Sequence, residues 1–100
     1  MSNGFIQVKN TGEFVATFDV YYTLNGKEIS SSSGHFTAGV SKSILIPDGA
    51  TKISLKIKEE YFVWSWSTVL THTFDHPPNK CYEISGLPRD AHAKEVPCEH

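Results

Sequence analysis

The side chains of His72, Asp75 and His76 are of the types that bind metals or transfer protons, and they lie close together in the sequence. A zinc site needs three or four such ligands, and proton transfer needs an acid and a base within hydrogen-bond reach. Side chains on a strand alternate between its two faces, so His72 and His76 share one face while Asp75 points to the other. We therefore interpret these histidines as ordinary strand and loop residues, and we expect no metal and no cofactor.

The sequence contains no other pattern that indicates catalysis. It has no G-x-S-x-G nucleophile elbow and no glycine-rich phosphate loop, and no pair of carboxylates stands out by position. Asp19 has apolar neighbours, an outward position on its expected strand and no basic residue nearby in the sequence. We predict that the protein is not an enzyme and has no catalytic residues.

The two cysteines, Cys81 and Cys98, allow two interpretations. A disulfide between them would fix the C-terminal tail and stabilise the fold by roughly 3 kcal/mol. Two unpaired thiols in a reducing compartment are the alternative. Because the pair does not have C-x-x-C spacing, neither a zinc site nor a redox site is favoured.

An aromatic cluster occupies residues 59–66, between two expected strands, where polar turn residues are usual. Burying one Trp or Phe side chain is worth about 2–3 kcal/mol, so exposing several is costly. Either the aromatic side chains fold back over the end of the core, or they form a surface that a partner covers. In the second case, Trp and Tyr suit a membrane interface and also stack on sugars. The candidate binding residues of this segment are Tyr61, Phe62, Val63, Trp64 and Trp66.

The composition indicates one globular domain. The chain has 100 residues, of which 39% are hydrophobic, and a net charge of −2 with both signs interleaved. It has no basic face for nucleic acid and no run of about 18 apolar residues that would span a membrane. Its first four residues lack a signal-peptide pattern. We expect a soluble chain, cytosolic or already processed and secreted, with a single domain over residues 1–100.

Period-two alternation of apolar residues predicts the secondary structure. Asn25-Gly26 favours a two-residue hairpin turn, and Ile53, Leu55 and Ile57 are expected to face a core, with lysines on the opposite, solvated face. No stretch shows a sustained helical period. The fold class is therefore all-β, a two-sheet antiparallel sandwich of about seven to eight strands within residues 5–88. The expected strands are residues 5–10, 14–23, Lys27–Ser32, Ser41–Ile46, 52–58, 67–75 and 80–85.

Two segments are predicted to be irregular. The serine run at residues 30–33 marks a strand end that passes into a mobile loop. The tail at residues 89–100 is polar, with Val96 and Cys98 as its only expected anchors.

The order of these features resembles the C-terminal membrane-binding β-sandwich domain (domain 4) of the cholesterol-dependent, or thiol-activated, cytolysins. Residues 10–20, N-T-G-E-F-V-A-T-F-D-V, are similar to that domain's opening S-G-A-Y-V-A-Q-F-x-V strand, and residues 25–29 to its D-G-K-E-V hairpin. Ile46-Pro47 and residues 53–59 resemble its I-P and its I-R-I-K-A-R-E strand. Trp64-Ser65-Trp66 with Thr68-Val69 looks like the end of its undecapeptide loop. The resemblance covers roughly residues 5–88.

The resemblance implies a non-catalytic sandwich whose tip loops touch a membrane or a glycan, and it adds Leu87 to the candidate binding residues. In the family, a Thr-Leu pair recognises sterol, and here Gly86-Leu87-Pro88 keeps only the leucine. The segment at residues 59–67 is about two residues shorter than the family's E-C-T-G-L-A-W-E-W-W-R and lacks its cysteine, third tryptophan and arginine. We expect docking on a membrane lipid, sterol or glycan, with no pore formed by this chain alone, so that a separate pore-forming partner is possible.

Protein association is the alternative function. An edge strand such as Lys27–Ser32, or the aromatic cluster itself, would then be the interface of a homo-oligomer.

Overall fold

The computed structural model describes residues 3–62, 65–87 and 90–98, and it describes the side chains of these residues except 61, 62 and 65. The described residues form strands and connections without a helix, which confirms the all-β prediction. The strands are β1 (Gly4–Asn10), β2 (Val15–Leu24), β3 (Lys27–Ser32), β4 (Ser41–Ile46), β5 (Thr51–Phe62), β6 (Ser65–Phe74), β7 (Asn79–Leu87) and β8 (Asp90–Val96).

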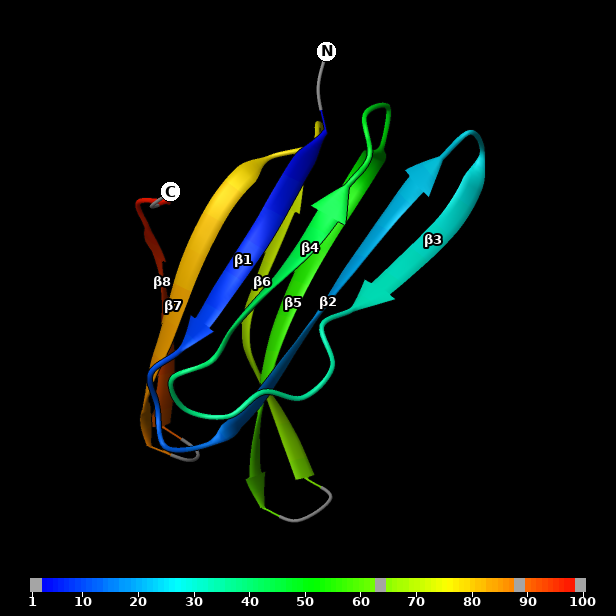
Figure 1. Cartoon of the computed structure of the whole chain (residues 1–100). Helices are drawn as coiled ribbons and strands as arrows, with labels where there is room; N and C mark the ends of the chain where they lie inside the picture. Colours follow the sequence, from blue (N-terminus) through cyan, green and yellow to red (C-terminus); the bar gives the residue numbers. More distant parts are fainter. Residues whose placement is uncertain (1–2, 63–64, 88–89, 99–100) are drawn as a thin grey trace.

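The strands form two four-stranded sheets, which Figure 1 shows as the two layers of a sandwich. One sheet has the order β4-β1-β7-β8 and the other has the order β3-β2-β5-β6. Among the strand pairs of the described residues, β1 and β7 are parallel and the others are antiparallel. The first strand of the chain is thus held between the fourth and the seventh.

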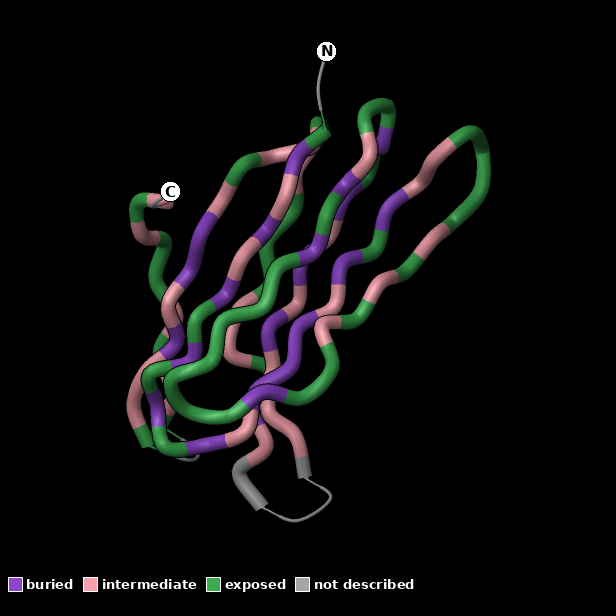
Figure 2. The backbone as a smooth tube through the Cα atoms, viewed as in Figure 1, coloured by how far each residue is buried: buried purple, intermediate pink, exposed green. Residues whose placement is uncertain are grey.

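The core lies between the two sheets and follows the predicted alternation. Ile6 and Val8 from β1 pack with Ile53, Leu55 and Ile57 from β5, and all five side chains are fully buried. Figure 2 shows the same alternation as buried segments that recur along each central strand. The inward residues of β2 join the same cluster, so the two periodic strands recognised in the sequence form the centre of their sheet.

The predicted hairpin between β2 and β3 is confirmed. Asn25 and Gly26 both have positive φ, 52° and 78°, as the two-residue turn requires. β3 lies at the edge of its sheet, as its sparse apolar content predicted.

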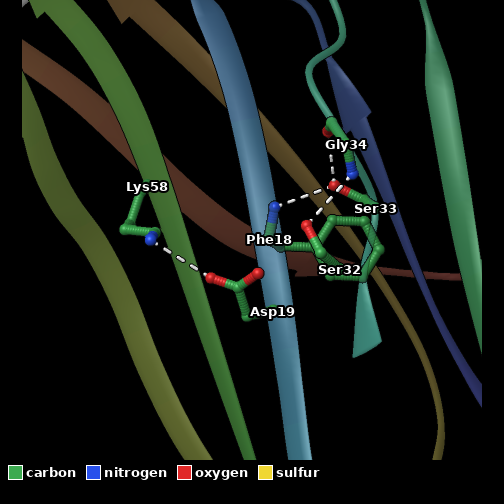
Figure 3. Close-up of polar contacts among 6 residues, drawn as sticks. All are labelled: Phe18, Asp19, Ser32, Ser33, Gly34 and Lys58. Carbon is green, nitrogen blue, oxygen red and sulfur yellow. Dashed lines mark hydrogen bonds and ion pairs between the residues drawn. The ribbon is translucent and has the colours of Figure 1, made fainter. Parts of the chain in front are cut away.

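Ser30, Ser31 and Ser32 of the serine run belong to β3 and pair with β2, and hydrogen bonds hold the following Ser33 against β2 as well (Figure 3). The Ser33 hydroxyl accepts a hydrogen bond from the backbone N–H of Phe18 at 2.9 Å and donates one to the carbonyl of Gly34 at 2.8 Å. Figure 3 also shows Lys58 on β5 beside Asp19, with Nζ 3.1 Å from Oδ2. The basic partner of Asp19 therefore comes from the neighbouring strand, far away in the sequence.

The C-terminal tail is not irregular, and that prediction is wrong. Asp90–Val96 forms β8, which pairs antiparallel with β7 from Cys81↔Val96 to Leu87↔Asp90. Ala91 and Ala93 are partly buried against the core. Cys81 and Cys98 form a disulfide with their Cα atoms 5.3 Å apart, which resolves the alternative that the sequence left open.

Candidate functional site

Four connections of the chain meet at one end of the sandwich, at the bottom of Figure 1. We call this end the tip; its described residues are 11–14, 33–40, 59–62, 65–67, 86–87 and 90. The N-terminus lies at the opposite end (Figure 1). The hairpin of β5 and β6 extends beyond the other connections of the tip.

The aromatic segment is part of a long hairpin, so the prediction of a connecting loop over residues 59–66 is wrong. β5 continues to Phe62 and β6 begins at Ser65, and the two strands pair as far as Phe62↔Ser65. Glu59 continues the inward alternation of β5 and is 1% exposed, a placement beyond the end of the strand expected at residues 52–58. The hairpin is thus a direct extension of the central strand β5 and the edge strand β6 of its sheet.

The candidate binding residues fall into two groups. Val63 and Trp64, and the side chains of Tyr61 and Phe62, lie outside what the structure describes. Trp66 and Leu87 are described, and both lie at the tip: Trp66 is half-buried, and the Leu87 side chain is 55% exposed at the end of β7.

The Trp66 ring lies against a residue that the sequence did not single out. The ring of His35, from the connection between β3 and β4, is 5.1 Å away between centroids and tilted by 37°. His35 stands between Gly34 and Phe36, so its position in the sequence carried no signal of this contact. The contact joins the β5–β6 hairpin to a second connection of the tip.

A buried amide organises the connections behind the tip. Asn10 is fully buried, and its Nδ2 donates hydrogen bonds to the carbonyls of Phe14 at 2.7 Å and Phe36 at 3.2 Å. Its Oδ1 accepts a hydrogen bond from the N–H of Gly12 at 2.9 Å. All three hydrogen bonds of the Asn10 side chain are made to backbone groups. One side chain thus holds the β1–β2 and the β3–β4 connections together.

The end of β7 is fixed to the same region. Thr11 donates hydrogen bonds to the carbonyl of Ile84 from its N–H at 2.8 Å and from its hydroxyl at 3.0 Å, and the N–H of Glu13 donates to the carbonyl of Gly86 at 3.1 Å. Gly86 has a φ of 111°, and a Cβ atom there would collide with the carbonyl of Asp90. Only glycine fits this position, which directly precedes Leu87.

The histidines do not form a metal site in the described part of the chain, where no group of three or more potential ligands comes together. The Nδ1 of His72 lies 3.2 Å from the hydroxyl of Tyr82 on the other sheet, and its ring packs 4.6 Å from that of Phe74. Its partner Leu55 across the β5–β6 ladder is buried, so His72 shares the inward face. His72 therefore lies at the margin of the inward face, where it is exposed and contacts the other sheet through Tyr82.

Comparison with known proteins identifies the fold family. The family model described as the thiol-activated cytolysin beta sandwich domain matches residues 5–88. The chain belongs to this family. The resemblance found in the sequence is thereby confirmed over the same residues. No curated protein sequence matches the chain.

Solved structures share the fold of this cytolysin-family chain. The membrane-binding domain of pneumolysin has a TM-score of 0.70 and 21% identity, with 98% of this chain and 99% of that domain covered. Listeriolysin O gives a TM-score of 0.72 at 22% identity over 97% of this chain. Suilysin from Streptococcus suis gives 0.72 at 18% identity over 98%. The chain spans 23% of the length of the listeriolysin O structure and 24% of that of suilysin.

Proposed function

We propose that the protein is a non-catalytic binding module that docks on a membrane surface through its tip. The observation that supports this most directly is the placement of Trp66 and Leu87, from the two different sheets, at the same end of the sandwich. The family match and the fold shared with a membrane-binding domain agree with this assignment.

The chemistry of the tip suits a membrane interface. Leu87 is an exposed aliphatic side chain, and the hairpin that extends furthest contains the Tyr61, Phe62, Val63, Trp64 and Trp66 sequence. Aromatic side chains with one polar group favour the headgroup region, where the ring is shielded and the N–H or O–H remains solvated. In the described part of the chain, no helix is long and apolar enough to cross a bilayer.

The scaffold behind the tip is suited to this role. Asn10 and Thr11 tie two connections, β1–β2 and β3–β4, to one another and to β7 through buried and partly buried hydrogen bonds. A rigid support means that little conformational entropy is lost when the tip side chains enter the interface. This arrangement favours recognition of a surface by a few fixed side chains.

The proposed target is a lipid surface, with sterol as a component to be tested. The family's Thr-Leu pair is reduced here to Leu87, and the shortened hairpin lacks the arginine of the undecapeptide. Both changes remove polar groups, although the hairpin also lacks the third tryptophan of the undecapeptide. We therefore expect binding to neutral phosphatidylcholine vesicles, with sterol increasing it less than about tenfold.

Vesicle flotation with tryptophan emission tests the proposal. Wild-type protein should float with phosphatidylcholine vesicles, with and without sterol, and its emission should shift to the blue only when vesicles are present. Trp64→Ala and Leu87→Ala should each weaken binding by roughly ten- to hundredfold, as expected for loss of about 1.5–3 kcal/mol of apolar burial.

Leu45→Ala is the matched control, because Leu45 is 65% exposed on β4 and pairs with Phe5 near the start of β1, away from the tip. This variant should bind vesicles like the wild type. Equal binding by Trp64→Ala, Leu87→Ala and wild type would refute docking through the tip. No blue shift, together with a size that grows with protein concentration, would instead support self-association through an edge strand.

A further inference from the structure

The outer edge of β6, the last strand of the β3-β2-β5-β6 sheet, is a surface that the proposed docking does not use. Among the described residues, β6 is paired with β5 alone, so one row of its backbone N–H and C=O groups faces away from the sheet. The strand begins at Ser65 in the tip and runs to Phe74, toward the opposite end of the molecule (Figure 1). Such a row of backbone groups can pair with a strand of another chain.

The sequence of β6 lacks the features that usually protect an edge strand. It reads S-W-S-T-V-L-T-H-T-F, with no Lys, Arg, Asp, Glu or Pro, and its ten residues make it the longest of the four edge strands. The other three edges each contain a lysine: Lys27 in β3, Lys42 in β4 and Lys94 in β8. Charges and prolines prevent edge-to-edge association of sheets, so β6 is the edge best suited to pairing.

One half of β6 has a regular geometry. The register with β5 shifts between Ile57 and Lys58, and Val69 is left without a paired residue at this bulge. Over Leu70–Phe74, which we call the regular segment, the register is continuous. Because a bulge twists an edge away from an approaching strand, the regular segment is the part of β6 that a further strand fits.

The regular segment also leaves apolar surface uncovered. Leu70 and Phe74 point inward and pack against the core, yet both remain half-buried. The strand that faces them from the other sheet is β8, whose inward residues Ala91 and Ala93 are small. A strand added to the edge of β6 would cover Leu70 and Phe74 and would extend the core.

We propose that β6 is the interface of a dimer, in which the regular segments of two copies pair antiparallel about a two-fold axis at His72. The segment reads L-T-H-T-F, so its chemistry is nearly the same in both directions. Thr71 then lies opposite Thr73 of the second copy, and Leu70 lies opposite its Phe74. Cross-strand threonine pairs are stabilising, and the apolar pair shields both side chains from water. This self-complementarity, without any like charges brought together, is what selects a second copy as the partner.

The dimer places its two tips at opposite ends. β6 starts in the tip, and antiparallel pairing reverses the direction of the strand in the second copy (Figure 1). The two tips therefore point away from one another, and one dimer can contact two separate membranes. This bridging rests on the proposed membrane docking, whereas the dimer itself does not.

Sedimentation of the full chain without vesicles tests the dimer. An interface made by one short strand belongs with the small interfaces, which are transient. We expect the mass to rise from the 11.1 kDa of one chain toward twice that value as the protein concentration increases from about 1 µM to about 1 mM. A mass of one chain at every concentration in this range overturns the proposal.

Two double variants assign the interface to β6, because Thr71 and Thr73 are exposed and lie opposite one another in the proposed pairing. Thr71→Glu/Thr73→Glu places carboxylates opposite carboxylates and should weaken dimerisation by about tenfold or more. Thr71→Glu/Thr73→Lys places carboxylates opposite ammonium groups and should retain dimerisation within about threefold. Equal dimerisation of the two variants overturns the assignment, and thermal melting like that of the wild type shows that both are folded.

Light scattering by phosphatidylcholine vesicles tests the bridging. Wild-type protein should cluster the vesicles, whereas Thr71→Glu/Thr73→Glu, whose tip is unchanged, should float with them without clustering them. Equal clustering by the two proteins, or none by a wild type that both dimerises and floats, overturns the opposed arrangement of the tips. If the wild type dimerises but does not float, the dimer is supported and the docking proposal fails.

Discussion

At the scale of single residues, Tyr82 joins the two sheets through a polar contact at one side of the sandwich. The side chain is buried on β7 and its hydroxyl lies 3.2 Å from Nδ1 of His72 on β6. Burial, and to a smaller extent the negative charge of Glu95, raises the pKa of the Tyr82 hydroxyl above its ordinary value. The neutral phenol is therefore the form that the folded state stabilises.

This raised pKa predicts a loss of stability in alkali. Above about pH 10 the unfolded chain releases the Tyr82 proton while the folded chain retains it, so the free energy of unfolding falls as pH rises. Below about pH 9 both states are protonated and the contribution is constant. Urea unfolding of wild type and Tyr82→Phe between pH 8 and 11 checks this. The stability advantage of the wild type over the variant should shrink above pH 10; a constant difference would contradict it.

The ion pair between Asp19 and Lys58 joins two residues that are far apart in the sequence, so it could not be predicted from the sequence. The outward position of Asp19 was predicted from the alternation of β2, and its partner was not, because Lys58 becomes a neighbour only through the β2–β5 register. The same holds for His35 beside Trp66 and for the backbone partners of Asn10. Residue types indicate which groups need partners, and the register decides which groups provide them.

At the scale of elements, β8 depends on a covalent link in addition to its hydrogen bonds. It is an edge strand, and alanine, with little surface to bury, supplies two of its partly buried side chains. The disulfide from Cys98 to Cys81 on β7 fixes its far end. Removal of the link should therefore affect β8 first.

The double variant Cys81→Ser/Cys98→Ser should lose roughly 3 kcal/mol of unfolding free energy, because the unfolded chain regains the freedom that the link removed. Urea unfolding measures the loss, and amide exchange should show the largest increase in β8. As a control, wild type treated with a reductant should reproduce the effect. If the double variant and the wild type are equally stable, the link is not formed in the protein as purified.

Most strands were predictable because each alternates between apolar and polar residues over its whole length. β8 was missed since its inward residues are small, so the same period carries almost no hydrophobic signal. The extension of β5 and β6 into the tip was missed for the opposite reason: aromatic and apolar residues stand at consecutive positions of the sequence, so the period-two alternation is lost. The parallel pairing of β1 with β7 has no local signature at all.

At the scale of the whole molecule, docking and perforation are separate properties. A pore requires protein segments that cross the hydrocarbon region with all of their backbone polar groups hydrogen-bonded. The proposed docking uses only the side chains of a hairpin and a turn. The chain corresponds to 23% of the listeriolysin O structure that it resembles. We expect it to bind vesicles without opening them.

Dye-loaded phosphatidylcholine vesicles with sterol check this expectation. At protein concentrations that give complete flotation, release should stay at the level of vesicles alone, and detergent should then release all of the dye. Release that rises with bound protein would contradict the expectation and would show that this chain alone disturbs the bilayer.

The parallel contact between β1 and β7 also has a consequence for synthesis. β1 pairs with β4 on one side, but its other edge is completed only when β7 arrives, about 70 residues later. At translation rates of about 5–20 residues per second, the ribosome needs roughly 4–15 s to deliver it. During that interval the nascent chain exposes an unpaired strand edge, which makes the newly emerged N-terminal half a natural substrate for chaperones.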